Sequence, residues 1–170
     1  MAFAVRAPKD QLAAGIPAPG PLVDFGMSFP LLLALHAAAT WGMVGVIWLV
    51  QLLVYPAMRE VPVERWLTWH LQHCQRISYV VGPLMLVEVF TALGLWLQGL
   101  SGAVFYTSLA LLAVNWLSTL VIQIPLHGIC EKAHSPTAIR RLITTNWIRT
   151  LAWSARGVLV GLLVLEGMRA

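Results

Sequence analysis

Four long apolar stretches, separated by short polar ones, dominate the pattern of this chain. They cover Leu31–Tyr55, Ile77–Gln98, Ala103–Ile124 and a stretch that begins near Pro136 and is apolar from Trp147 to Leu165. An amphipathic lead-in from Val63 precedes the second stretch. A helix needs about 20 residues to cross a bilayer, and within lipid it satisfies all of its own backbone hydrogen bonds. The pattern therefore predicts an all-α fold, an integral membrane four-helix transmembrane bundle.

The residues around these stretches predict where the helices begin and end. Serine is a favourable N-cap residue and precedes three of the helices, at Ser28, Ser101 and Ser135. Pro125 and Gly128 follow the third stretch, and since these residue types often mark helix ends, we expect the third helix to stop there. The start of the chain is rich in Pro, Gly and Ala. We predict that residues 1–27 form a flexible arm and that residues 28–170 form the transmembrane domain.

Composition narrows the class of protein further. Of the 170 residues, 59% are hydrophobic and only 11% are charged, whereas soluble domains carry about 25% charged residues. This balance excludes a soluble domain, a disordered tail and a coiled coil. The chain holds two cysteines, so a disulfide-rich secreted domain is excluded as well.

The distribution of basic residues predicts the orientation of the bundle. Four spans place both termini and the turn at residues 98–102 at one end, here called the terminal end. The other two connections form the opposite end, the basic end, which holds Arg59, Arg65, Arg76, Lys132, Arg140, Arg141 and Arg149. Because Lys and Arg are enriched on the cytoplasmic side, we expect the basic end in the cytoplasm and both termini on the opposite side of the membrane. The net charge of +4 then reflects topology, and we expect no nucleic-acid partner.

Polar residues near the centre of the spans are expensive to bury in lipid without a partner. Glu88, Asn115 and Arg156 each lie near the middle of a span. Their matching depth predicts a buried Glu88–Arg156 pair with Asn115 as a third member. This group is either a structural lock or a site for a substrate, proton or cofactor. His36 lies alone in the first stretch, where it either packs in the core or meets a cofactor.

Metal-ligating residue types gather at the basic end. Helix steps of three and four share a face, which applies to the spacing of His70, His73 and Cys74. His127 and Cys130 follow the third stretch with the same spacing. Imidazole and thiolate are good ligands for zinc, copper and iron. These five residues are therefore candidates for a transition-metal or haem site, and the alternative is a set of interfacial histidines that bind no metal.

The two halves of the sequence resemble each other weakly, which indicates a tandem duplication of a two-helix unit. In this alignment His73 and Arg76 correspond to Asn146 and Arg149. Together with Tyr55 and His127 they would line a vestibule at the basic end, with aromatic walls supplied by the interfacial tryptophans Trp66, Trp69 and Trp147. Two arginines favour an anionic or phenolate-like group, and histidine exchanges protons near neutral pH. We expect His73, His127, Arg76, Arg149, Asn146 and Tyr55 to form a catalytic site.

Three short motifs carry a resemblance to a known group of proteins. They are "GMVGVIWLVQLLVYPA" at residues 42–57, "QIPLH" at residues 123–127 and "NWIRT" at residues 146–150. The chain resembles small four-helix bacterial membrane proteins of unknown function akin to the anthrone oxygenases. His127 stands where that group carries the Asn of a Pro-x-Asn step. The resemblance implies an oxygenase-like or aromatic-substrate-binding role.

Three functions follow from these observations. The first is a membrane oxidoreductase that acts on a lipophilic aromatic or quinone-like substrate entering from the lipid bilayer. The second is an accessory subunit of a larger membrane complex or a homo-oligomer, docking through its tryptophans and the Gly157-x-x-x-Gly161 spacing and binding a pigment or haem. The third is a small transporter that uses Glu88 and Arg156. We favour the first.

Overall fold

The computed structural model describes residues 26–168. Within this range, four helical spans are long and apolar enough to cross a membrane: Phe29–Glu60, Val63–Leu97, Ala103–Lys132 and Pro136–Gly167. The chain is therefore an all-α membrane bundle of four helices, as the apolar pattern predicts. The predicted arm at residues 1–27 lies outside the described residues except for its last two positions.

The first and third spans are each interrupted by one π-helical segment. The first span consists of α1 (Phe29–Leu49), a π segment (Val50–Val54), α2 (Tyr55–Ala57) and a 3₁₀ turn (Met58–Glu60). The third consists of α4 (Ala103–Ser118), a π segment (Thr119–Gln123) and α5 (Ile124–Lys132). The other two spans are α3 (Val63–Leu97) and α6 (Pro136–Gly167).

The third helix does not end at Pro125 and Gly128, contrary to the sequence-based expectation. The amide of Ile124 donates to the carbonyl of Thr119, five residues earlier, and this wider turn accommodates a proline that has no amide proton to donate. The helix therefore continues to Lys132. Tyr55 makes the same five-residue bond to Val50, directly before Pro56. Both halves of the chain therefore have a π-helical turn directly before a proline. The tandem duplication itself stays a prediction.

The helix starts follow the capping serines only in part. Ser135 caps α6, and its Oγ accepts a hydrogen bond from the amide of Ala138 at 3.3 Å. Ser28 occupies the N-cap of α1 without a side-chain bond. Ser101 does not cap α4, because the N-cap residue is Gly102, whose φ of 108° suits glycine and not serine.

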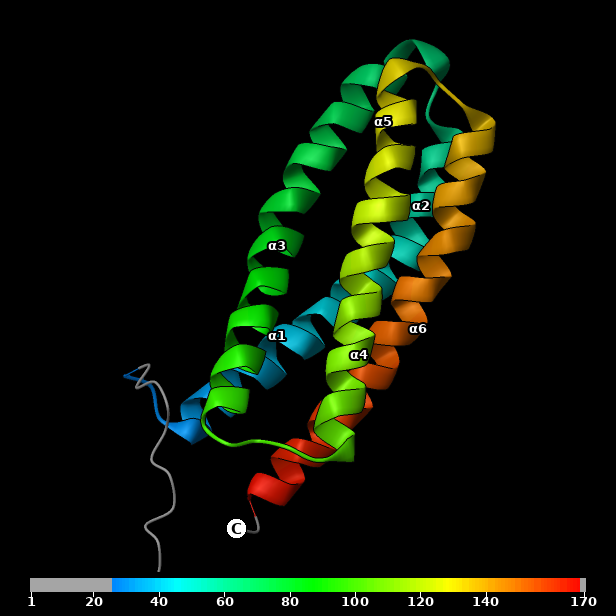
Figure 1. Ribbon diagram of the computed structural model, residues 1–170. Coiled ribbons are helices and arrows are strands. Elements are labelled where there is room, and N and C mark those ends of the chain that lie inside the picture. Colours follow the sequence, from blue (N-terminus) through cyan, green and yellow to red (C-terminus); the bar gives the residue numbers. More distant parts are fainter. Residues whose placement is uncertain (1–25, 169–170) are drawn as a thin grey trace, which may run out of the picture.

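The helices are arranged so that both described chain ends lie at the terminal end of the bundle (Figure 1). In this view α3 stands on the left and α6 on the right, with α4 and α5 between them and α1 crossing at an angle. α6 packs against α1 and α4, and α1 also packs against α3. α3 meets the third span through α5 at the basic end.

Buried apolar clusters hold the bundle at three levels. One lies at the terminal end, around Leu32, Leu95 and Phe105. A second lies midway, around Met43, Ile47, Met85 and Trp153. The third, at the basic end, consists of Val50, Tyr55, Met58, Trp66, Leu126, Cys130, Ala138, Ile139 and Leu142. Buried polar side chains form two groups, one near the centre of the spans and one toward the basic end.

Candidate functional site

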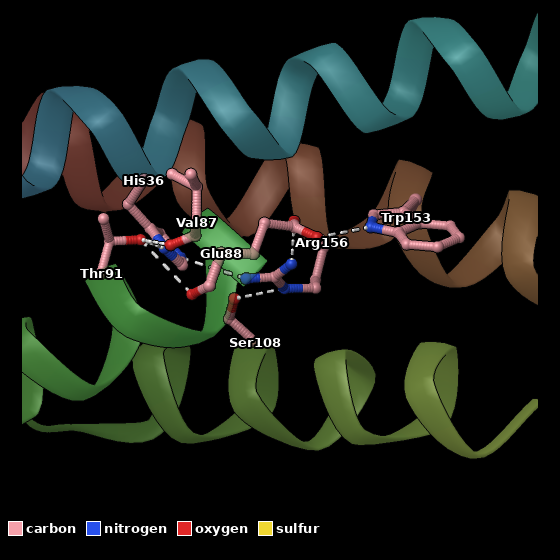
Figure 2. Close-up of polar contacts among 7 residues, drawn as sticks. All are labelled: His36, Val87, Glu88, Thr91, Ser108, Trp153 and Arg156. Atoms are coloured by element: carbon pink, nitrogen blue, oxygen red, sulfur yellow. Dashed lines mark hydrogen bonds and ion pairs between the residues drawn. The ribbon is translucent and has the colours of Figure 1, made fainter. Parts of the chain in front are cut away.

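The first polar group, here called the central network, consists of His36, Glu88, Thr91, Ser108, Trp153 and Arg156. Arg156 Nη1 forms the predicted ion pair with Glu88 Oε1, and both side chains are fully buried. Trp153 Nε1 donates to the other carboxylate oxygen at 3.1 Å, and Arg156 Nε donates to Ser108 Oγ at 3.3 Å. The network contains residues from α1, α3, α4 and α6 and connects all four spans (Figure 2).

The hydrogen bonds of the central network fix the tautomer of His36. Thr91 Oγ1 donates to the carbonyl of Val87 at 2.6 Å, so it accepts from His36 Nδ1 at 2.8 Å. The other ring nitrogen, Nε2, then accepts from Arg156 Nη2 at 3.1 Å. His36 is therefore neutral, and it belongs to the central network through its hydrogen bond from Arg156.

Asn115 does not join this network, contrary to the prediction from its depth. Its side chain is fully buried, but neither amide atom has a hydrogen-bond partner among the described residues. Depth along a helix is readable from the sequence, whereas the direction of a side chain around the helix depends on packing. Thr91, Ser108 and Trp153 occupy the positions around the ion pair instead. Two of them have a signal in the sequence, because Thr91 follows Glu88 and Trp153 precedes Arg156 by three residues, a spacing that indicates a shared helix face.

The second polar group, the basic-end site, consists of Gln51, Tyr55, Gln123, His127, Asn146 and Arg149. It adjoins a cavity of about 370 Å³ that is lined by residues of all four spans. Most of the cavity wall is apolar, including Ile47, Val81 and Met85. Its polar lining residues are Tyr55, His73, Ser78, Thr119, Gln123, His127 and Arg149. Leu86, Leu120 and Ile124 also line the cavity and are about half exposed on the lipid-facing surface. The cavity is therefore open toward the membrane on this side.

Arg149 lies in the wall of this cavity and is held from α6. Its side chain is buried, and Nη1 donates to Asn146 Oδ1 at 3.3 Å. Asn146 in turn donates to Gln51 Oε1 at 2.8 Å. The guanidinium lies 5.2 Å from the Trp153 ring centroid, and its Nε has no hydrogen-bond partner among the described residues. The Glu88–Arg156 pair is the only carboxylate ion pair within residues 26–168, so Arg149 has no such counter-charge there.

Tyr55 and His127 form a second polar contact in the cavity wall. Tyr55 Oη donates to Gln123 Oε1 at 3.3 Å and lies 3.4 Å from His127 Nε2. Gln123 Nε2 then donates to Thr145 Oγ1 at 3.1 Å. Four of the six predicted catalytic residues line one cavity: Tyr55, His73, His127 and Arg149. A fifth, Asn146, accepts the hydrogen bond from Arg149.

Arg76 is the predicted catalytic residue that lies elsewhere. Its side chain is exposed, and it does not line the cavity. Although the sequence alignment of the halves pairs it with Arg149, α3 turns that position outward. Trp66 also departs from its predicted place in an interfacial belt, because it is 2% exposed and donates to the carbonyl of Cys130 at 2.8 Å.

The predicted metal ligands fall into two sets. His70, Cys74 and His127 bring their donor atoms within 4.8 Å of one another. His73 faces the cavity and stacks on Trp69, with ring centroids 5.3 Å apart. Cys130 is fully buried in the apolar cluster of the basic end. Because α5 continues as a helix beyond Pro125, His127 faces α3 while Cys130 points into the core.

No family model, curated protein or solved structure matches the chain.

Proposed function

We propose that the chain binds a lipophilic ring compound with a phenolic or quinone-type oxygen, which enters the cavity from the bilayer. The buried guanidinium of Arg149 is the observation that carries this proposal, because it adjoins an apolar cavity and has no carboxylate partner among the described residues. A buried cation without a counter-charge is costly. An oxygen acceptor on a ligand supplies the missing hydrogen bonds.

The character of the cavity supports a ligand with one polar edge. Its volume of about 370 Å³ lies within the range of small-molecule sites, about 300–1,000 Å³. Apolar side chains suit a hydrocarbon ring, and Tyr55, His127 and Arg149 together provide a polar edge. The half-exposed Leu120 and Ile124 mark the side facing lipid, from which a lipophilic molecule enters without crossing water.

The chemical part of the proposal is charge stabilisation and proton exchange at the ligand oxygen. Arg149 would hold the ligand oxygen and stabilise negative charge on it, as a guanidinium does for carboxylates and phosphates. His127 would exchange the proton of that oxygen, because its ring lines the same cavity and an imidazole can pass a proton through its ring nitrogens. The resemblance to the anthrone oxygenase-like group points to the same class of aromatic substrate.

Binding of 1,4-naphthoquinone and 1-naphthol to the full chain in lipid nanodiscs tests the proposal. Trp116 lines the cavity, so quenching of tryptophan fluorescence reports binding. We expect saturable binding of both probes and weaker binding of naphthalene, which has no oxygen. Arg149→Met should lower probe affinity by about 10- to 100-fold, because a hydrogen bond to a charged group contributes about 1.5–3 kcal/mol.

Arg76→Met is the matched control, since it removes an exposed arginine outside the cavity. Its probe affinity should equal that of the original chain. Equal binding of naphthalene and 1-naphthol, or unchanged affinity in Arg149→Met, would refute the proposal.

The proposal includes an orientation in the bacterial inner membrane. The basic end carries most of the Lys and Arg residues near the spans, which favours the cytoplasmic side. A fusion of alkaline phosphatase to the C-terminus should then be active, and a fusion of green fluorescent protein should be dark. The reverse pattern would place the basic end outside.

A further inference from the structure

Three metal-ligating side chains from two helices converge beside the cavity. His70 and Cys74 lie one turn apart on α3, and His127 faces them from α5. Cys74 Sγ lies 3.5 Å from His70 Nε2 and 3.6 Å from His127 Nδ1. A tetrahedral Zn²⁺ about 2.3 Å from sulfur and about 2.0–2.1 Å from nitrogen holds these donors about 3.6 Å apart. Both sulfur–nitrogen distances match that requirement.

We propose that His70, Cys74 and His127 bind one Zn²⁺ ion. All three donor atoms lie within 4.8 Å of one another, and tetrahedral Zn²⁺ places two imidazole nitrogens about 3.3 Å apart. Rotation of the two rings about their side-chain bonds closes the remaining distance. One thiolate and two imidazoles suit Zn²⁺ and leave its fourth position open, whereas Mg²⁺ and Ca²⁺ prefer oxygen ligands.

The hydrogen bonds around His127 leave its Nδ1 ready to coordinate. The hydroxyl proton of Tyr55 is donated to Gln123, so the contact between Tyr55 Oη and His127 Nε2 at 3.4 Å has the ring nitrogen as donor. With the proton on Nε2, Nδ1 has a free lone pair directed at Cys74. Metal-ligating histidines usually have such a partner on their second nitrogen.

Coordination changes one existing contact of His70. Its Nε2 lies 3.3 Å from the carbonyl oxygen of His127 and donates to it. Zn²⁺ would replace this hydrogen bond, and the ring proton would move to Nδ1, which has no hydrogen-bond partner among the described residues. The change is local, because His70 also contacts Trp66, with ring centroids 5.1 Å apart.

An opening to the surface gives the ion a route to these ligands. Cys74 and His127 line a groove of about 280 Å³ together with Gly128 and Glu131. Glu131 is exposed. A Zn²⁺ ion with one thiolate and two neutral imidazoles carries a net charge of +1, and the Glu131 carboxylate provides an opposite charge in the same groove.

Cobalt binding to the purified full chain in detergent tests the site without reference to the lipophilic ligand. Co²⁺ replaces Zn²⁺ in tetrahedral sites and shows a thiolate charge-transfer band. We expect one Co²⁺ per chain, with that band, and displacement of Co²⁺ by Zn²⁺. Cys74→Ser should abolish the band and weaken Co²⁺ binding by at least about 100-fold, because outer partners alone are worth about 10- to 100-fold.

Two variants serve as matched controls for the ligand variant. Cys130→Ala removes the other cysteine, and His73→Gln removes the neighbouring histidine on α3; both should keep the band and the stoichiometry. If circular dichroism shows that Cys74→Ser loses helix, His127→Gln replaces it as the ligand variant. Absence of the band in the folded original chain, or its loss in Cys130→Ala, would overturn the proposal. Failure of naphthoquinone binding would refute only the proposed function.

Discussion

Two buried arginines on α6 have opposite surroundings. Arg156 forms an ion pair with Glu88 and also donates to His36 and Ser108. Arg149, two turns earlier, donates to Asn146, and its Nε has no partner among the described residues. The first adjoins packed helices on all sides, and the second lines a cavity.

This difference between the two arginines indicates that the central network is structural and that the basic-end site binds a ligand. The central network pairs its charges and connects all four spans, so its contribution is to hold the helices in register. The basic-end site leaves Arg149 Nε without a partner among the described residues, beside the cavity. An unpaired buried donor is costly unless a ligand completes it. Trp153 belongs to both regions, since its Nε1 donates to Glu88 while its ring lies under Arg149.

The largest expected effect comes from breaking the ion pair of the central network. Glu88→Gln keeps the shape of the side chain and removes the charge that compensates Arg156. Because removing one partner leaves an uncompensated buried charge, the free energy of unfolding should fall by about 3–5 kcal/mol. Thermal unfolding in nanodiscs, followed by circular dichroism, measures the change.

A double variant distinguishes charge imbalance from a simple packing defect. Glu88→Leu combined with Arg156→Met removes both charges and should recover most of the lost stability, since apolar replacement of a buried pair is often neutral. If Glu88→Gln were as stable as the original chain, the central network would not be the lock that its geometry indicates.

The next effect compares the two arginines directly. Arg156→Met should destabilise the bundle through the unpaired Glu88, whereas Arg149→Met removes a cation that has no carboxylate partner. Arg149→Met loses a hydrogen bond and the contact with Trp153, but it also removes the free-energy cost of burying that cation, and the two effects offset each other. We expect Arg149→Met to be the more stable variant by about 2 kcal/mol or more, measured by the same unfolding experiment. Equal losses would mean that Arg149 is structural as well.

The sequence pattern predicted the bundle and the central ion pair because both depend only on the position of residues along the helices. Span length follows from apolar runs, and residue depth follows from position in a run, which is why Glu88 and Arg156 could be paired. Asn115 shares that depth but remains outside the network. Its rotational position around α4 is set by packing, which depth does not encode.

The composition of the basic-end site depended on two features that the sequence does not show directly. The π segment at Thr119–Gln123 carries the third helix past Pro125, and this continuation directs His127 toward α3 and Cys130 into the core. The outward position of Arg76 likewise follows from how α3 packs. Helix spacing identified the candidates for the metal and cavity sites, and tertiary packing decided between them.

The smallest expected effect concerns Tyr55, where the cavity and the proposed metal site meet. Tyr55→Phe removes the acceptor for His127 Nε2 and should weaken Co²⁺ binding by about 10-fold, the lower value for an outer partner of a metal ligand. Tyr106→Phe is the control, because Tyr106 is 50% exposed and is absent from both groups of residues; its Co²⁺ affinity should not change. An unchanged affinity in Tyr55→Phe would show that the basic end holds two independent sites. A loss would show that the ring of His127 connects them, so that a metal ion on Nδ1 fixes a proton donor on the side of the ring that faces the cavity.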